Sequence, residues 1–208
     1  MIAALLLALT ASGPIEAEKT FERDAQRIGQ WTAFRKYADR DAVMFTPQAV
    51  WARDFLMDRK NPRKSISWRP AESFVSCDGR SAVNSGPWFT PAVKLAGYFT
   101  TVWQRTGGKW RWVYDGGGPL KRAADTSPPK LHRASCSGNA PGPPIIPPPP
   151  LTRNQARTTP EDNGRGESAD RTLGWDWKVG KKGERHFRVY QWSGARYVLV
   201  INDFVPHS

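Results

Sequence analysis

The sequence is poor in the residue types that most often carry chemistry. Its 208 residues include only three histidines, His132, His186 and His207, and they follow no metal-ligand spacing. The chain also lacks a phosphate-binding P-loop, a dinucleotide-binding fingerprint and a nucleophile elbow. We therefore expect neither a metal nor a cofactor, and the sequence by itself names no substrate.

Cysteine is almost as scarce, with Cys77 and Cys136 as the two examples. An even pair in an exported protein is compatible with a disulfide, which would tie the region around Cys136 to the strand that precedes Cys77. The alternative is two unpaired thiols, with Cys77 buried as a small apolar residue. The sequence leaves both open, because pairing depends on the separation of the two Cα atoms.

No hydrophobic run is long enough to span a membrane as a helix, which needs roughly 20 residues. The longest is Ile2–Leu9, IAALLLAL, followed by small and turn-forming residues. This pattern predicts a secretory signal peptide at residues 1–17, with cleavage after Ser12 or Ala17, although no Lys or Arg follows Met1. We expect a periplasmic or secreted protein; a buried N-terminal helix is the alternative.

Acidic residues are outnumbered by basic ones, 19 to 31, which gives a net charge of +12. A dispersed positive excess favours anionic surroundings such as envelope polymers, or else simply forms a solvated basic surface. No basic and aromatic groove is evident, so we expect no specific nucleic-acid partner. The densest basic cluster comprises Arg53, Arg59, Lys60, Arg63, Lys64 and Arg69.

Proline is concentrated in one region, residues 119–170, which includes the run Pro147–Pro150. Such a composition is typical of an extended, disordered linker. Residues 171–208 return to strand patterns separated by tight turns and predict a three-stranded antiparallel meander. About 38 residues rarely fold alone, so the meander should pack on the main domain or on a second copy of the chain.

The sequence pattern predicts that residues 18–118 form the main domain. Residues 18–38 form an amphipathic helix, with Phe21, Ala25, Ile28, Trp31, Phe34 and Ala38 on one face. A short strand at 42–45 and a second helix at 51–60 follow, and then strands at 68–77, 81–86, 97–105 and 109–115. Simple alternation along the last strand puts Trp110, Trp112 and Tyr114 on one face, and Arg111, Val113 and Asp115 on the other.

The segments FRKYADRDAVMFTP (34–47), SCDGRSAVNSG (76–86) and GYFTTVWQR with KWRWVYDGG (97–105 and 109–117) resemble the NTF2-like superfamily, most closely its secreted DUF4440 and SnoaL-like members. The resemblance covers residues 18–118. It implies an α+β fold in which a curved antiparallel sheet wraps around the first helix as a cone, with an apolar pocket at the open end. Members often dimerise through the convex sheet face, which the meander would cover here, so both a monomer and a homodimer are compatible.

The resemblance to ketosteroid isomerases within this superfamily implies acid–base work by a tyrosine and carboxylic acids in the pocket, with Asp115 and Tyr37 as the catalytic candidates. Asp39 and Asp41 read more simply as a helix stop, and Asp115 as a strand end. Three functions stay open: a binder of a small apolar or amphipathic ligand, an isomerase, dehydratase or cyclase, and a basic module for anionic envelope polymers. The candidate wall residues of the pocket are Trp31, Trp68, Trp103, Trp112 and Tyr114.

Overall fold

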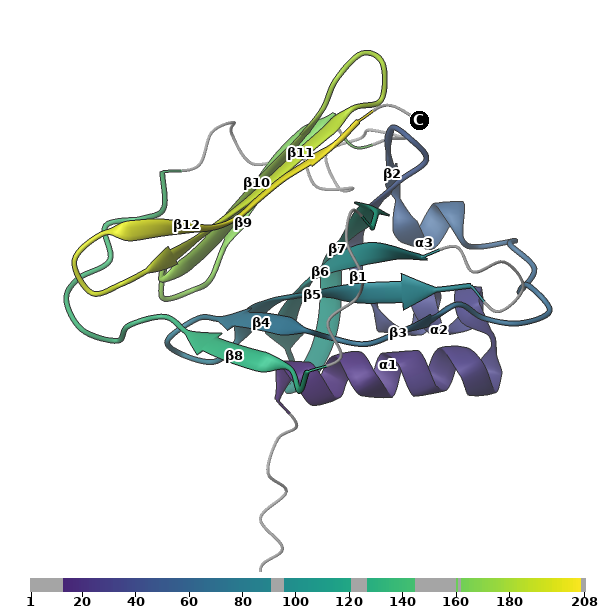
Figure 1. Cartoon of the computed structure of the whole chain (residues 1–208), viewed down its shortest axis with the longest axis horizontal. Helices are drawn as coiled ribbons and strands as arrows, with labels where there is room; N and C mark the ends of the chain where they lie inside the picture. The colour runs from purple at the N-terminus through teal and green to yellow at the C-terminus, as the bar shows by residue number, and fades with distance from the viewer. Residues whose placement is uncertain (1–12, 91–95, 121–126, 145–159, 161, 207–208) are drawn as a thin grey trace, which may run out of the picture.

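The computed structural model describes residues 13–90, 96–120, 127–144, 160 and 162–206. These residues form an α+β fold with a large curved mixed sheet and a separate antiparallel sheet of four strands (Figure 1). The main sheet has the order β2-β1-β7-β6-β5-β4-β8, and β3 pairs with β5. Its elements are α1 (Pro14–Ile28), α2 (Gln30–Tyr37), β1 (Ala38–Phe45), β2 (Ala49–Trp51), α3 (Ala52–Phe55), β3 (Ser67–Trp68), β4 (Glu72–Val75), β5 (Ser81–Phe89), β6 (Ala96–Thr106), β7 (Lys109–Pro119) and β8 (Lys130–Arg133).

The main sheet is not purely antiparallel, so this part of the prediction is wrong. Strand β1 runs parallel to β7, and β8 runs parallel to β4. Parallel neighbours are joined through long connections, and here each pair brings together segments far apart in the chain. A strand pattern gives the length and facing of a strand but not its distant partner, which explains the error.

The first helix differs from its prediction at both ends. It begins at Pro14, inside the predicted signal peptide, and the carbonyl of Pro14 accepts a hydrogen bond from Asn84 Nδ2 at 2.9 Å. Cleavage after Ser12 would leave α1 whole, whereas cleavage after Ala17 would remove its first turn. Gly29, with φ of 95°, then separates α1 from α2, because glycine adopts this backbone conformation without a steric penalty.

The expected disordered linker at 119–170 contains two strands. Strand β8 extends the main sheet beyond β4, and β9 (Asn163–Glu167) pairs with β10 (Leu173–Val179). Both are short, polar and rich in turn-forming neighbours, so they lack the apolar alternation that identifies a strand in a sequence. Residues 121–126, 145–159 and 161 of the expected linker lie outside the described part.

The C-terminal sheet has the order β12-β11-β10-β9, with β10 (Leu173–Val179), β11 (Arg185–Trp192) and β12 (Tyr197–Val205), so the predicted meander of three strands gains β9. Figure 1 shows this sheet over one face of the main sheet and α1 on the opposite side. One hydrophobic cluster joins α1 and α2 to the inner face of the main sheet. A second cluster joins the outer face to Trp175, Trp177 and Phe187 of the C-terminal sheet, the packing that the sequence predicts for the meander.

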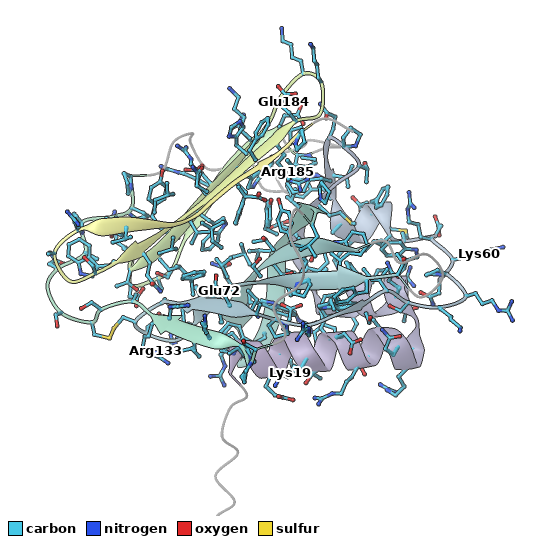
Figure 2. All side chains as sticks on the ribbon, viewed as in Figure 1. Lys19, Lys60, Glu72, Arg133, Glu184 and Arg185 are labelled. Atoms are coloured by element: carbon cyan, nitrogen blue, oxygen red, sulfur yellow. A yellow bond between two sulfur atoms is a disulfide. The ribbon has the colours of Figure 1, made fainter. Side chains whose placement is uncertain are left out.

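The predicted helix at 51–60 is short, because Trp51 ends β2 and α3 covers only Ala52–Phe55. The basic residues that follow it are exposed, and Lys60 extends from the tip of this loop (Figure 2). Among the described residues, no helix is long and apolar enough to cross a membrane.

Candidate functional site

A cavity of about 270 Å³ lies between the helices and the inner face of the main sheet. Its walls are mostly aromatic and aliphatic, and Asp115 and Arg185 bring charge to it. The lining residues are Phe21, Phe34, Met44, Phe45, Ile66, Trp68, Trp88, Phe99, Thr101, Asp115, Gly116, Gly117, Gly118 and Arg185.

A β-bulge in β7 places Asp115 on the wall of this cavity. Trp103 pairs with Trp112, whereas the preceding residue of β6, Val102, pairs with Tyr114, so Val113 is the extra residue. A bulge of one residue reverses the facing of everything beyond it. Tyr114 therefore joins the outer face and Asp115 the inner one, so the prediction that Trp112 and Tyr114 share a face is wrong.

Asp115 is held in a setting that favours its neutral form. Thr101, directly across the strand pair, donates a hydrogen bond from Oγ1 to Asp115 Oδ2 at 2.9 Å. Burial raises the pKa of Asp115 from 3.8 to about 7, while the hydrogen bond from Thr101 and the charge of Arg185 act in the opposite direction. The side chain is only partly buried by its neighbours, because it borders the cavity. A carboxyl that titrates near neutrality can accept or donate a proton under ordinary conditions.

Three glycines continue the strand beyond Asp115 and form the cavity wall beside it. A Cβ on Gly117 would lie 2.0 Å from the carbonyl oxygen of Tyr98, and one on Gly116 would lie 2.7 Å from the hydroxyl of Tyr114. Side chains therefore do not fit at these positions, and the backbone itself forms the wall.

Arg185 reaches the cavity from the C-terminal sheet. Its exposed fraction is 7%, and in Figure 2 it lies between the two sheets. Its Nη2 donates to the carbonyl oxygen of Gly117, and its guanidinium carbon lies 4.4 Å from the ring centre of Phe45. The C-terminal sheet therefore completes the cavity as well as covering the outer face of the main sheet.

A second buried carboxyl, Glu18 of α1, lies beneath the aromatic wall with an exposed fraction of 0%. It accepts hydrogen bonds from Nε1 of Trp103 at 2.6 Å, from Nε1 of Trp68 at 2.9 Å and from Nδ2 of Asn84 at 3.1 Å. Burial raises the pKa of Glu18 to about 7; the three hydrogen bonds lower it, and the charge of Asp115 raises it slightly further. Sequence reasoning missed Glu18, although its three-residue spacing from Phe21 places it on the apolar face of the helix.

Tyr37 does not share the site with Asp115, so the predicted catalytic pair is not brought together. The hydroxyl of Tyr37 donates to Asp24 Oδ2 at 2.9 Å, in a cluster where Asp24 also binds Lys36 and Arg27. Burial, with the hydrogen bond and charge of Asp24, raises the pKa of Tyr37 to about 12. This cluster is built from α1 and α2 and takes no part in lining the cavity.

Of the five predicted wall residues, only Trp68 lines the cavity. Trp31 packs against Phe34 at the edge of the inner cluster. Trp103 and Trp112 are completely buried in that cluster, behind the wall. Tyr114 stacks on Phe187 of the C-terminal sheet, with ring centres 4.3 Å apart. Alternation could not show that Trp103 and Trp112 lie behind the wall, because they point to the same side of the sheet as the lining residues, and it could not show the bulge that turns Tyr114 outward.

The two cysteines form a disulfide between Cys77, just after β4, and Cys136, just after β8, with Cα atoms 5.2 Å apart. The bond fastens the edge of the main sheet where β8 joins it. The nearby side chain of Gln191 donates to the carbonyl oxygens of Val75 and His132, which ties the C-terminal sheet to the same edge. The hydrogen bonds of Gln191 hold the two sheets together near the end of β11 opposite to Arg185.

Within the described ranges, no group of three or more histidine, cysteine, aspartate or glutamate side chains is arranged to hold a metal ion. The polar and charged side chains that line the cavity are those of Asp115, Thr101 and Arg185. A comparison of the sequence with protein-family models and with curated proteins finds no match to either.

Proposed function

We propose that the protein binds a small, mostly apolar molecule in the cavity, with the polar end of that molecule at Asp115. The observation that carries this proposal is the lining itself: aromatic rings from α1, α2, β3, β5 and β6 surround a space with a charged end. Ligand sites are typically apolar concavities of roughly 300–1,000 Å³ with a few polar groups that fix orientation. A cavity of about 270 Å³ suits a molecule at the small end of that range.

The wider architecture supports this proposal and the resemblance behind it. A curved sheet with helices on its inner side and an apolar cavity between them is the arrangement that an NTF2-like cone requires. The C-terminal sheet covers the outer face through which such proteins often dimerise, which favours a monomer. The disulfide supports export, since disulfides persist in oxidising compartments.

A second candidate function is acid–base catalysis in the same cavity, and the observation that favours it is Asp115. A carboxyl with a pKa of about 7 in an apolar site is suited to abstract and return a proton at neutral pH. The chemistry would rest on Asp115 with Thr101 as its hydrogen-bond donor, without Tyr37. Turnover that Asp115→Asn abolishes, with ligand binding retained, would favour the enzyme over the pure binder.

The test of binding uses the intrinsic fluorescence of Trp68 and Trp88, which line the cavity. Titration with octanoate, 1-octanol, 3-phenylpropanoate and 3-phenylpropanol should change this fluorescence saturably. Ile66→Trp fills the cavity and should abolish the response, whereas Leu131→Trp on β8, where the side chain is 50% exposed, should not. A response that survives Ile66→Trp, or no response to any of the four probes, would contradict the proposal.

A further inference from the structure

We propose that the cavity selects ligands with a carboxylate head group and that Arg185, supplied by the C-terminal sheet, is the specificity-determining residue. This inference rests on the proposed binding function and deepens it by naming the ligand class. It assigns a role in recognition to a part of the chain outside the region of NTF2 resemblance.

The position of Arg185 in β11 is the first argument. Alternation places Arg185 on the same face as Phe187 and Val189, whose exposed fractions are 1% and 0%, and Arg185 itself is 7% exposed. An arginine on the apolar, inward face of a strand is rare, because its charge must leave water. Here the guanidinium lies at the border of the cavity, where a ligand can reach it.

The second argument is that the charge of Arg185 is incompletely compensated. Its Nη2 is bonded to the carbonyl of Gly117, but its Nε is buried and has no hydrogen-bond partner, and it forms no ion pair with any described carboxylate. A buried cation is costly unless an anion and hydrogen-bond acceptors accompany it. A ligand carboxylate would supply both, since its two oxygens match the donors of a guanidinium.

The other charged and titratable groups near Arg185 are bonded to neighbours, and none of the described carboxylates forms an ion pair with it. Asp203 of β12 accepts a hydrogen bond from Oη of Tyr98, and the hydroxyl of Tyr114 is hydrogen-bonded to Arg185; burial raises the pKa of both phenols, so they stay neutral. Glu18 is held by its three donors and is absent from the lining. Asp115 remains as the carboxyl that faces the ligand with Arg185.

Asp115 gives the binding of an anion a characteristic dependence on pH. A carboxylate beside Asp115 favours its protonated form, because two like charges at one site repel. Binding of an acid should therefore take up a proton, and its affinity should fall as the pH rises above the pKa of Asp115, which is about 7. Binding of an alcohol that donates its hydroxyl to the ionised Asp115 should instead strengthen with pH.

The experiment measures dissociation constants of the full chain for octanoate and 1-octanol by isothermal titration calorimetry between pH 6 and 8. At pH 7 we expect octanoate to bind more tightly than 1-octanol. The affinity for octanoate should fall by up to about tenfold from pH 7 to pH 8, which is the limit for the uptake of one proton. Arg185→Gln should weaken the binding of octanoate at least about tenfold and that of 1-octanol less than about twofold. Arg185→Lys, which keeps the positive charge, should retain part of the preference for octanoate over 1-octanol. Asp115→Asn should make the affinity for octanoate independent of pH.

Arg196→Gln makes the same change at an exposed position in the turn after β11 and should leave both affinities unchanged. Equal binding of acid and alcohol, or equal loss of both in Arg185→Gln, would overturn the role of Arg185 while the cavity remains a binding site. Absence of binding by both probes would overturn the binding function and this inference together. Circular dichroism of each variant shows whether it is folded, so that a loss of affinity can be distinguished from a loss of folding.

Discussion

Glu18, which is buried, and Asp115, which borders the cavity, should make the protein less stable as the pH rises toward neutrality. Asp115 and Glu18 both have a pKa raised to about 7, chiefly by burial. Such a carboxyl holds its proton more tightly in the folded than in the unfolded state. Its stabilising contribution is complete below its unfolded pKa of about 4 and is lost as the pH rises through about 7. Each should lower the free energy of unfolding by about 1.4 kcal/mol per pH unit in this range, or by about 4 kcal/mol for each group between its unfolded pKa and its folded pKa.

Urea unfolding at several pH values between about 5 and 6.5 measures this slope directly. Asp115→Asn removes one of the two titrating groups and should reduce the slope to about half that of the original protein. Asp58→Asn, the same change at an exposed position, should leave the slope unaltered. Stability that is constant or rises from pH 5 to pH 6.5 would refute the reasoning, and so would an Asp115→Asn profile parallel to that of the original protein.

Three further perturbations test other parts of the structure. Reduction of the bond between Cys77 and Cys136, or Cys77→Ser, should cost about 4 kcal/mol for a loop of 59 residues and lower the melting temperature in calorimetry by roughly 10 °C; an unchanged melting temperature would contradict a structural role. Gly117→Ala should destabilise the fold by at least about 1 kcal/mol in urea unfolding, because its Cβ would lie 2.0 Å from a backbone oxygen of Tyr98, and a neutral effect would show that this wall is pliable. Glu18→Gln should cost roughly 1–3 kcal/mol at about pH 4.5, where Glu18 is still protonated in the folded protein, since the amide cannot accept from all three of its donors, and equal stability of the two proteins would show that these hydrogen bonds matter little.

The sequence predicts the elements of this fold better than their partners. The amphipathic spacing of α1, the aromatic hairpin of β6 and β7, and the strands β10 to β12 are all local patterns, and each is present. The parallel pairing of β1 with β7 and of β8 with β4 depends on contacts between distant segments, which no local pattern records. Strands β8 and β9 are held by backbone ladders with little apolar content, so composition alone suggests a linker.

Some residues of the candidate site can also be identified from the sequence, whereas others depend on distant contacts. Asp115 and Trp68 are recognisable from the sequence, because a carboxylate at the end of an aromatic strand and a tryptophan in a strand both stand out. The position of Asp115 on the inner face depends on the bulge at Val113. No glycine or proline stands at Val113 itself to indicate a bulge in the sequence. Arg185 lies about 70 residues further along the chain, and its burial depends on how one sheet packs on another.

The bulge at Val113 also means that the chemistry of this wall depends on how β7 pairs with β6 as much as on side-chain identity. A strand that kept Val113 but paired without the bulge would turn Tyr114 inward and send Asp115 to the outer face against the C-terminal sheet. The cavity would then lose its carboxylate and gain a phenol. Removal of the single codon for Val113 would instead leave Tyr114 opposite Val102 and Asp115 opposite Thr101, so the extra residue can be lost without changing which side chains face the cavity.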